Sequence, residues 1–168
     1  MLVRMNDGST NFLDFREKAP GKASATMYQD EKGNVIPNLS RVGYKAVGVP
    51  GSVKGMVHAQ QRYGKLSLAQ VVAPAIRLAR DGFEIDWYVA LSFALYAERL
   101  WKAGEAKRIF FRPSGAPLRP PIGTEPSDRV VQTDLARTLE RIARDGPDVL
   151  YRGEIGRASC RERVSECV

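Results

Sequence analysis

Apolar and polar positions change their spacing along the chain, from short runs near the N-terminus to helical periods after residue 51. Apolar runs over residues 1–5 and 11–15 flank the turn residues Asn6, Asp7 and Gly8, a pattern typical of a β-hairpin. Residues 21–48 have no long period and contain turn pairs such as Gly33-Asn34. This region is therefore predicted to be a loop with a short helix.

Two amphipathic helices are predicted directly after this loop. The first runs from about residue 52 to Tyr63, where Gly64 stops it. In the second, Ser67 and the glutamine three residues later form a capping-box pattern, and apolar residues follow at offsets of three and four as far as Asp81. Pro74 lies inside this stripe, so we expect it to kink or restart the helix.

Two further helices are predicted in the second half of the chain. One runs from Asp86 to about Ala103, and because it is apolar on more than one face we expect it to be buried. A proline-rich loop over residues 112–127 follows. The last helix, from Thr133 to Arg144, is expected to turn these residues inward: Leu135, Thr138, Leu139 and Ile142. The predicted fold class is α+β, mostly helical after an N-terminal β-hairpin.

Composition places the chain among ordinary globular proteins of one domain. Its 168 residues are 43% hydrophobic and 27% charged. No stretch approaches the roughly 20 apolar residues needed to span a bilayer. Residues 1–15 do not resemble a signal peptide, because Arg4, Asn6 and Asp7 interrupt the apolar run. The protein is therefore expected either to be cytoplasmic or to have its targeting segment upstream.

The formal net charge of +7 raises an alternative, namely a small basic helical module that binds nucleic acid or an acidic protein. The basic residues, however, stand beside acids, as in Arg16-Glu17, Arg80-Asp81 and Arg144-Asp145, and form no dense run. Basic and aromatic residues do not interleave as they do in single-strand binders. A solvated basic surface is the favoured interpretation, with the binding module as the alternative.

The last residues differ from the rest of the chain. Both cysteines, Cys160 and Cys167, lie there, and no apolar period or turn chemistry accompanies them. Back-translated, residues 155–164 can be written as a DNA sequence similar to a widely used sequencing adapter. We therefore predict that residues 157–168 are a non-native tail and that the native domain comprises residues 1–156. The rival interpretation, a metal or disulfide tail, meets no usual zinc spacing.

Few residues in the chain are candidates for chemistry when each is taken by itself. His58, the single histidine, lies on a predicted helix without a patterned partner, so a structural or surface role is favoured over a general base. Gly48, Gly51 and Gly55 lack the Lys-Ser/Thr of a P-loop, and close backbone packing at a helix start explains them better. Asp14 and Glu17 flank Arg16, which favours ion pairing over acid–base catalysis. No metal or cofactor is indicated.

Five segments, taken together, resemble the large subunit of the γ-glutamyltransferases (γ-glutamyltranspeptidases) in that family's order and spacing. They cover essentially residues 1–156. The segments are LDFREKAP at 13–20, GVPGSVKG at 48–55, Tyr63-Gly64, APAIRLARDGF at 73–83 and GPDVLYRGEI at 146–155.

The resemblance implies an N-terminal-nucleophile hydrolase with a four-layer αββα sandwich. A precursor of this family cleaves itself, and the new N-terminal Thr of the small subunit attacks the γ-glutamyl amide of glutathione or a similar donor. Water, an amino acid or a peptide then accepts the group. The α-amine of that Thr serves as base, so no histidine is required. Arg16 corresponds to the family's arginine that binds the donor's α-carboxylate, as a planar guanidinium does well.

The resemblance also sets limits on what this chain does. The nucleophile and the small subunit are not among these residues, and Thr10, Thr26, Thr124, Thr133 and Thr138 match no processing motif. The chain by itself is therefore expected to be inactive, with no catalytic residue of its own. The family further implies a periplasmic or extracellular protein whose partners are the small subunit, the donor and the acceptor.

Overall fold

The computed structural model describes residues 1–153, except for the side chain of Tyr44. The described residues form two compact units, one made of residues 1–68 and 144–153 and the other of residues 69–143. The predicted non-native tail lies outside the described residues, so the boundary at residue 157 stays a prediction.

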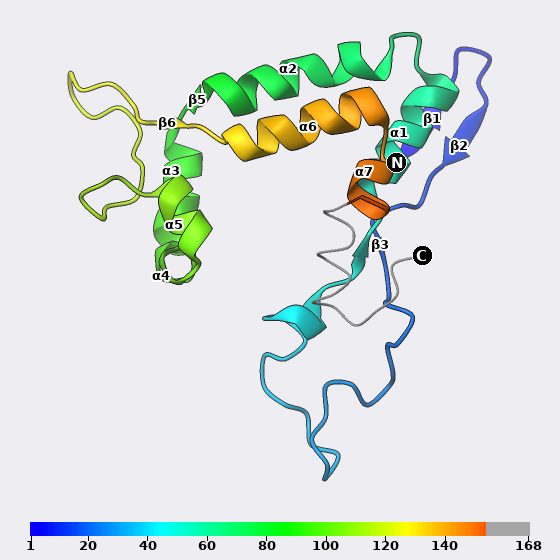
Figure 1. Cartoon of the computed structure of the whole chain (residues 1–168), viewed down its shortest axis with the longest axis horizontal. Coiled ribbons are helices and arrows are strands. Elements are labelled where there is room, and N and C mark those ends of the chain that lie inside the picture. Colours follow the sequence, from blue (N-terminus) through cyan, green and yellow to red (C-terminus); the bar gives the residue numbers. More distant parts are fainter. Residues whose placement is uncertain (154–168) are drawn as a thin grey trace. The chain divides into compact units, whose positions relative to one another are not determined.

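The first unit opens with the predicted hairpin (Figure 1). Strands β1 (Leu2–Arg4) and β2 (Thr10–Phe12) are antiparallel, with Leu2 opposite Phe12. The turn between them is fastened by Asp7, whose carboxylate accepts the Ser9 N–H at 2.9 Å. Gly8 takes a φ of +86° there, a conformation that glycine adopts without steric cost.

A second pair of strands in this unit was not predicted. Strand β3 (Glu17–Lys18) pairs antiparallel with β4 (Val49–Pro50) and closes the long loop between them. That loop contains the short helix that we expected, a 3-10 turn at Tyr44–Ala46. Two-residue strands carry no measurable alternation, which is why the sequence pattern does not reveal them.

Helix α1 (Ser52–Tyr63) begins directly after β4 and ends at Gly64, as predicted. It buries Val57 and Ala59. A short helix α7 (Asp148–Tyr151), which was not predicted, buries Val149. These small buried residues are the apolar core of the first unit.

In the second unit, α2 (Leu68–Asp81) and α6 (Thr133–Asp145) lie side by side (Figure 1). Arg80 of α2 forms an ion pair with Glu140 of α6, and the Gln132 N–H donates to the Ala79 carbonyl at 2.8 Å. Helix α2 continues through Pro74, so the predicted restart at this proline is wrong.

Strand β5 (Phe83–Glu84) follows α2 in the chain and pairs antiparallel with β6 (Arg129–Val130), which precedes α6. Gly82, at a φ of +77°, turns the chain from α2 into β5; a Cβ there would lie 2.7 Å from the Val131 side chain. The core of the unit comes from this strand pair, the residue after β5 and the two helices. Its buried residues are Ala79, Ile85, Val130, Ala136 and Ile142.

The prediction of one continuous helix from Asp86 to Ala103 is wrong. Helix α3 (Trp87–Leu95) ends at Tyr96, whose φ of −107° and ψ of 12° are not helical, and α4 (Ala97–Lys102) and α5 (Gly104–Phe110) follow. The breaks let aromatic residues of separate helices meet. Phe93 and Phe110 have ring centroids 5.0 Å apart, and Trp101 and Phe111 5.1 Å apart.

Two burial predictions are also wrong. No residue of α3 is buried, and Tyr88 and Leu95 are 79% and 71% exposed. In α6, Leu135 is exposed, whereas the neighbouring Ala136 is buried, with 2% of its surface exposed. The predicted loop at residues 112–127 is confirmed, since no helix or extended strand forms there. These mixed helices and small sheets are an α+β arrangement, as predicted.

Candidate functional site

The two segments 13–20 and 48–55, which are far apart in the sequence, lie against each other in the first unit. Strands β3 and β4 place Glu17 opposite Pro50 and Lys18 opposite Val49. Just before that pairing, the Gly51 N–H donates to the Arg16 carbonyl at 3.2 Å. The backbone that carries Arg16 is therefore held by the residues that begin α1.

Glycines allow this close approach. A Cβ at Gly51 would lie closer than 3.0 Å to the backbone oxygen of Phe15, and one at Gly55 closer than 3.0 Å to the Phe15 side chain. A Cβ at Gly48 would lie 3.2 Å from the Glu17 side chain. The close packing that we expected of these glycines is confirmed.

A cavity of about 560 Å³ lies beside this contact in the first unit. Its walls come from the end of the hairpin, from β3 and β4, from the first two turns of α1 and from α7. The polar side chains that line it are Asp14, Glu17, Lys18, Lys54, His58 and Tyr151. Charges of both signs thus face a space large enough for a small molecule.

Tyr151 of α7, from a third family-like segment, residues 146–155, also lines this cavity. The phenolic oxygen of Tyr151 accepts the backbone N–H of Lys54 at 3.3 Å. The N–H of Lys54 belongs to the first turn of α1, where backbone donors have no partner within the helix. Tyr151 therefore satisfies one of these donors and fixes α7 against α1.

Arg16, the predicted binding residue for the donor, lies at the rim of this region and is not among the residues that line the cavity. Its side chain is 86% exposed, and its Nη1 donates to the Glu17 carboxylate at 2.6 Å. The acids that flank Arg16 in the sequence led us to expect such an ion pair. The side chain is accessible, and within residues 1–153 its partner is this exposed neighbour.

His58, predicted to have a structural or surface role, is exposed on α1 and lines the cavity one turn after Lys54. Within residues 1–153, no group of three or more His, Cys, Asp or Glu side chains is placed to hold a metal ion. Cys160 and Cys167 fall outside the described residues. Lys54 and Tyr151 were not predicted as site residues, although both lie in segments that resemble the family.

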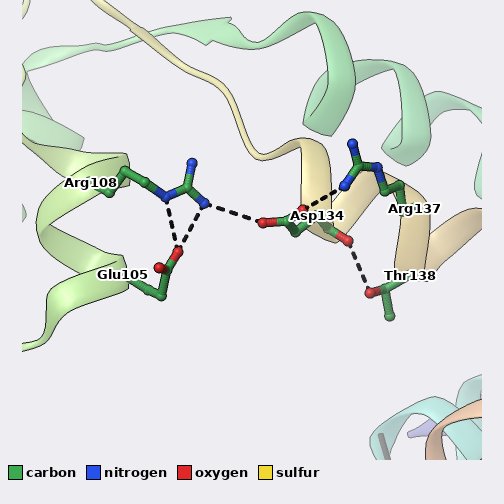
Figure 2. Close-up of polar contacts among 5 residues, drawn as sticks. All are labelled: Glu105, Arg108, Asp134, Arg137 and Thr138. Atoms are coloured by element: carbon green, nitrogen blue, oxygen red, sulfur yellow. Dashed lines mark hydrogen bonds and ion pairs between the residues drawn. The ribbon is translucent and has the colours of Figure 1, made fainter. Parts of the chain in front are cut away.

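The second unit contains a cluster of ion pairs, as Figure 2 shows. Arg108 of α5 contacts Glu105 at 2.9 Å and Asp134 of α6 at 3.2 Å. The hydrogen bond and the charge of Glu105, followed by the charge of Asp134, raise the pKa of Arg108 above its ordinary value. The cluster links α5 to α6.

The hydroxyl of Thr138 is engaged within its own helix. Its Oγ1 donates to the backbone carbonyl of Asp134 at 3.0 Å, inside the same helix (Figure 2). That bond is the ordinary interaction of a threonine within a helix. Arg137 pairs with the Asp134 carboxylate at 3.1 Å in the same turn.

Several of the arginines are paired with acids, which bears on the nucleic-acid alternative. Pairs occur in both units, for example Arg112 with Asp128 at 3.4 Å and Arg129 with Glu84 at 3.7 Å. In these pairs an acid offsets the charge of the arginine. Among the described residues, no helix is long and apolar enough to cross a membrane.

Comparison with known proteins gives a consistent result. The family model described as gamma-glutamyltranspeptidase matches residues 1–162. The glutathione hydrolase proenzymes of Pseudomonas sp. (strain A14) and Pseudomonas aeruginosa are 41% and 44% identical, over 92% and 88% of this chain. The chain spans 26% and 24% of these two relatives, about a quarter of their length.

Solved structures agree with the sequence comparison. The Helicobacter pylori gamma-glutamyltranspeptidase has a TM-score of 0.85 at 37% identity, covering 96% of this chain and 44% of that one. The enzyme from Pseudomonas nitroreducens, complexed with L-DON, has a TM-score of 0.79 at 38% identity, covering 100% of this chain and 48% of that one. The segments brought together around Arg16, the family match and these folds have one explanation: this chain belongs to the γ-glutamyltranspeptidase family.

Proposed function

We propose that this chain supplies the Arg16 side of the donor pocket in an enzyme that hydrolyses or transfers the γ-glutamyl group of glutathione and related compounds. Arg16 binds the donor's α-carboxylate through two charge-assisted hydrogen bonds. The observation that carries the proposal is the packing of segment 48–55 against the backbone of Arg16, with the Gly51 N–H on the Arg16 carbonyl at 3.2 Å.

The rest of the chemistry belongs to residues outside this chain. In the family that it resembles, a small-subunit Thr forms the acyl-enzyme, and water, an amino acid or a peptide resolves it. The small subunit is thus a partner, and self-cleavage of a proenzyme precedes activity. No cofactor enters this scheme. By the same resemblance, the enzyme works in the periplasm or outside the cell.

A chimaeric proenzyme tests this proposal. Residues 1–153 of this chain replace the matched segment of the Pseudomonas sp. (strain A14) relative, to which the chain is 41% identical. Self-cleavage, read by gel electrophoresis, reports that the chimaera folds. Release of aniline from a γ-glutamyl anilide reports donor use.

Arg16→Lys is the decisive variant, because it keeps the charge and loses the planar fork. We expect kcat/KM for the anilide to fall about 10- to 100-fold, corresponding to roughly 1.5–3 kcal/mol, while self-cleavage continues. Arg4→Lys, at an exposed arginine on β1, is the matched control and should change neither readout. Normal donor use by Arg16→Lys would make Arg16 a structural residue and end the proposal.

A further inference from the structure

We propose that Gly51 and Gly55 are positioning residues for Arg16. Because neither residue has a side chain, the backbone around Arg16 can pack closely against the start of α1. That position of the backbone sets the affinity of Arg16 for the donor. This inference rests on the proposed function of Arg16. The guanidinium is 86% exposed and stands at the end of a flexible side chain. Its reach toward a carboxylate therefore depends on where the backbone holds its Cα.

The contact at Gly51 involves backbone on both sides. Its N–H donates to the Arg16 carbonyl at 3.2 Å. A Cβ on Gly51 would crowd the carbonyl oxygen of Phe15 and lie 3.0 Å from its carbonyl carbon and 3.5 Å from its Cα. No rotamer change moves these atoms, so any side chain at residue 51 must push away the strand that leads into Arg16.

The contact at Gly55, one turn later on α1, involves the side chain of Phe15. A Cβ there would lie 2.5 Å from the ring atom Cδ1 of Phe15 and closer still to its Cγ and Cβ. The ring can swing away, but Cβ is fixed to the backbone one residue before Arg16. A substitution at Gly55 therefore also moves the backbone next to Arg16.

Other contacts of this strand lie on either side of Phe15 and Arg16. The β3–β4 ladder consists of two residue pairs, and both lie after Arg16. Before Phe15, the Leu13 N–H donates to the Met1 carbonyl at 2.8 Å. Between these two anchors, the position of the backbone depends on its contacts with Gly51 and Gly55. Misplacement of a binding group by about 1 Å can cost about 100-fold in rate, so displacing the strand should impair donor binding well before it unfolds the domain.

The experiment uses the chimaeric proenzyme and a γ-glutamyl anilide. Gly51→Ala and Gly55→Ala should each raise KM about 10-fold or more, with a smaller change in kcat, while self-cleavage continues. Gly104→Ala is the matched control, since a Cβ there meets nothing within 4 Å, and it should behave as the parent. Phe15→Leu, which loosens the same contact without crowding it, should raise KM less.

A double-mutant cycle separates positioning from general damage. In the Arg16→Lys background, Gly51→Ala should add almost no further loss of kcat/KM, because the group that it positions is already lost. Additive losses, or parental KM values in Gly51→Ala and Phe15→Leu, would overturn the inference. If Arg16→Lys by itself left donor use unchanged, the proposed function would have failed instead, so the two failures are distinguishable.

Discussion

The guanidinium of Arg16 lies 2.6 Å from the carboxylate of Glu17, its neighbour in the chain. Both groups are accessible, with 86% and 45% of their side chains exposed. Exposed pairs of this kind are screened by solvent and stabilise a protein by about 1 kcal/mol or less. A donor carboxylate that binds Arg16 would have to replace Glu17, so the neighbour acts as a weak competitor for the same group.

The first prediction follows from this competition. Glu17→Gln removes the competing charge, and we expect the chimaera's donor KM to fall by up to about 5-fold, the factor that corresponds to about 1 kcal/mol. The effect should shrink at high ionic strength, because salt already weakens the pair. Glu31→Gln, in the exposed loop, is the control. A higher KM in Glu17→Gln would mean that Glu17 helps to bind the donor.

The second prediction concerns the 168-residue chain by itself. Its threonines match no processing motif, and Thr138 is engaged within its helix at 3.0 Å. We expect no release of aniline from a γ-glutamyl anilide at any enzyme concentration. A preparation from cells that carry the empty vector measures the contaminant background. Turnover above that background would assign a nucleophile to this chain and overturn the division of roles.

The third prediction concerns pH and the loop at Asp30. The backbone N–H groups of Asn34 and Lys32 donate to its carboxylate at 2.8 and 2.9 Å, and the Asn34 bond is the main reason that the pKa of Asp30 is lowered. A lowered pKa stabilises the folded turn above the ordinary aspartate value of about 3.9. That stabilisation is lost as pH falls through the lowered value.

Because these contacts are local, a peptide of residues 26–38 can test this expectation by NMR titration. The Asp30 carboxyl should titrate below its ordinary value. Gly33→Ala is the control, because Gly33 has a φ of +84° and alanine disfavours that turn. The two peptides should differ in the pKa of Asp30, and identical titrations would show that the turn does not cause the shift.

The fourth prediction concerns the cluster of Figure 2. Arg108 pairs with Glu105 in its own helix and with Asp134 in α6, whereas Arg137 pairs with Asp134 inside α6 alone. We expect Arg108→Ala to lower the melting temperature of the chimaera more than Arg137→Ala does. The difference should shrink at high salt, since both pairs are exposed. Equal shifts in scanning fluorimetry would mean that the link between α5 and α6 contributes nothing.

The fifth prediction concerns self-association of the 168-residue chain. Trp87, Leu91 and Leu95 of α3 are 67%, 57% and 71% exposed, and the short β-hairpin has unpaired edges. Such surfaces associate in water. We expect oligomers in size-exclusion chromatography, with reductant removing covalent ladders from the two cysteines but not the association itself.

A pair of charge substitutions separates the causes of that association. Leu91→Glu should shift the chain toward smaller species, because it places a charge within the exposed face of α3. Leu66→Glu, at an exposed leucine outside that face, is the matched control and should change little. A monodisperse monomer with a cooperative thermal transition would show that these residues fold as a self-sufficient domain.

Several elements were predictable from the sequence because their causes are local. The turn residues at Asn6–Gly8 specify a hairpin, Gly64 ends α1, and the prolines of residues 112–127 exclude regular structure. The segment around Arg16 was recognisable in the same way, since a motif is a property of consecutive residues. Tyr96 shows the limit: nothing local breaks the helix there, and the break accompanies the contact between the tilted rings of Phe93 and Phe110.

The sequence by itself determined the family, the segment that carries Arg16 and the boundaries of α1, α2 and α6. Tertiary structure alone decided what surrounds Arg16. It pairs β3 with β4, packs Phe15 against Gly51 and Gly55, and brings the Lys54 N–H to the hydroxyl of Tyr151. Helix ends and turns arise from interactions between residues a few positions apart. Contacts between distant segments depend on how the whole chain minimises exposed apolar surface and unpaired polar groups, and no local pattern encodes that.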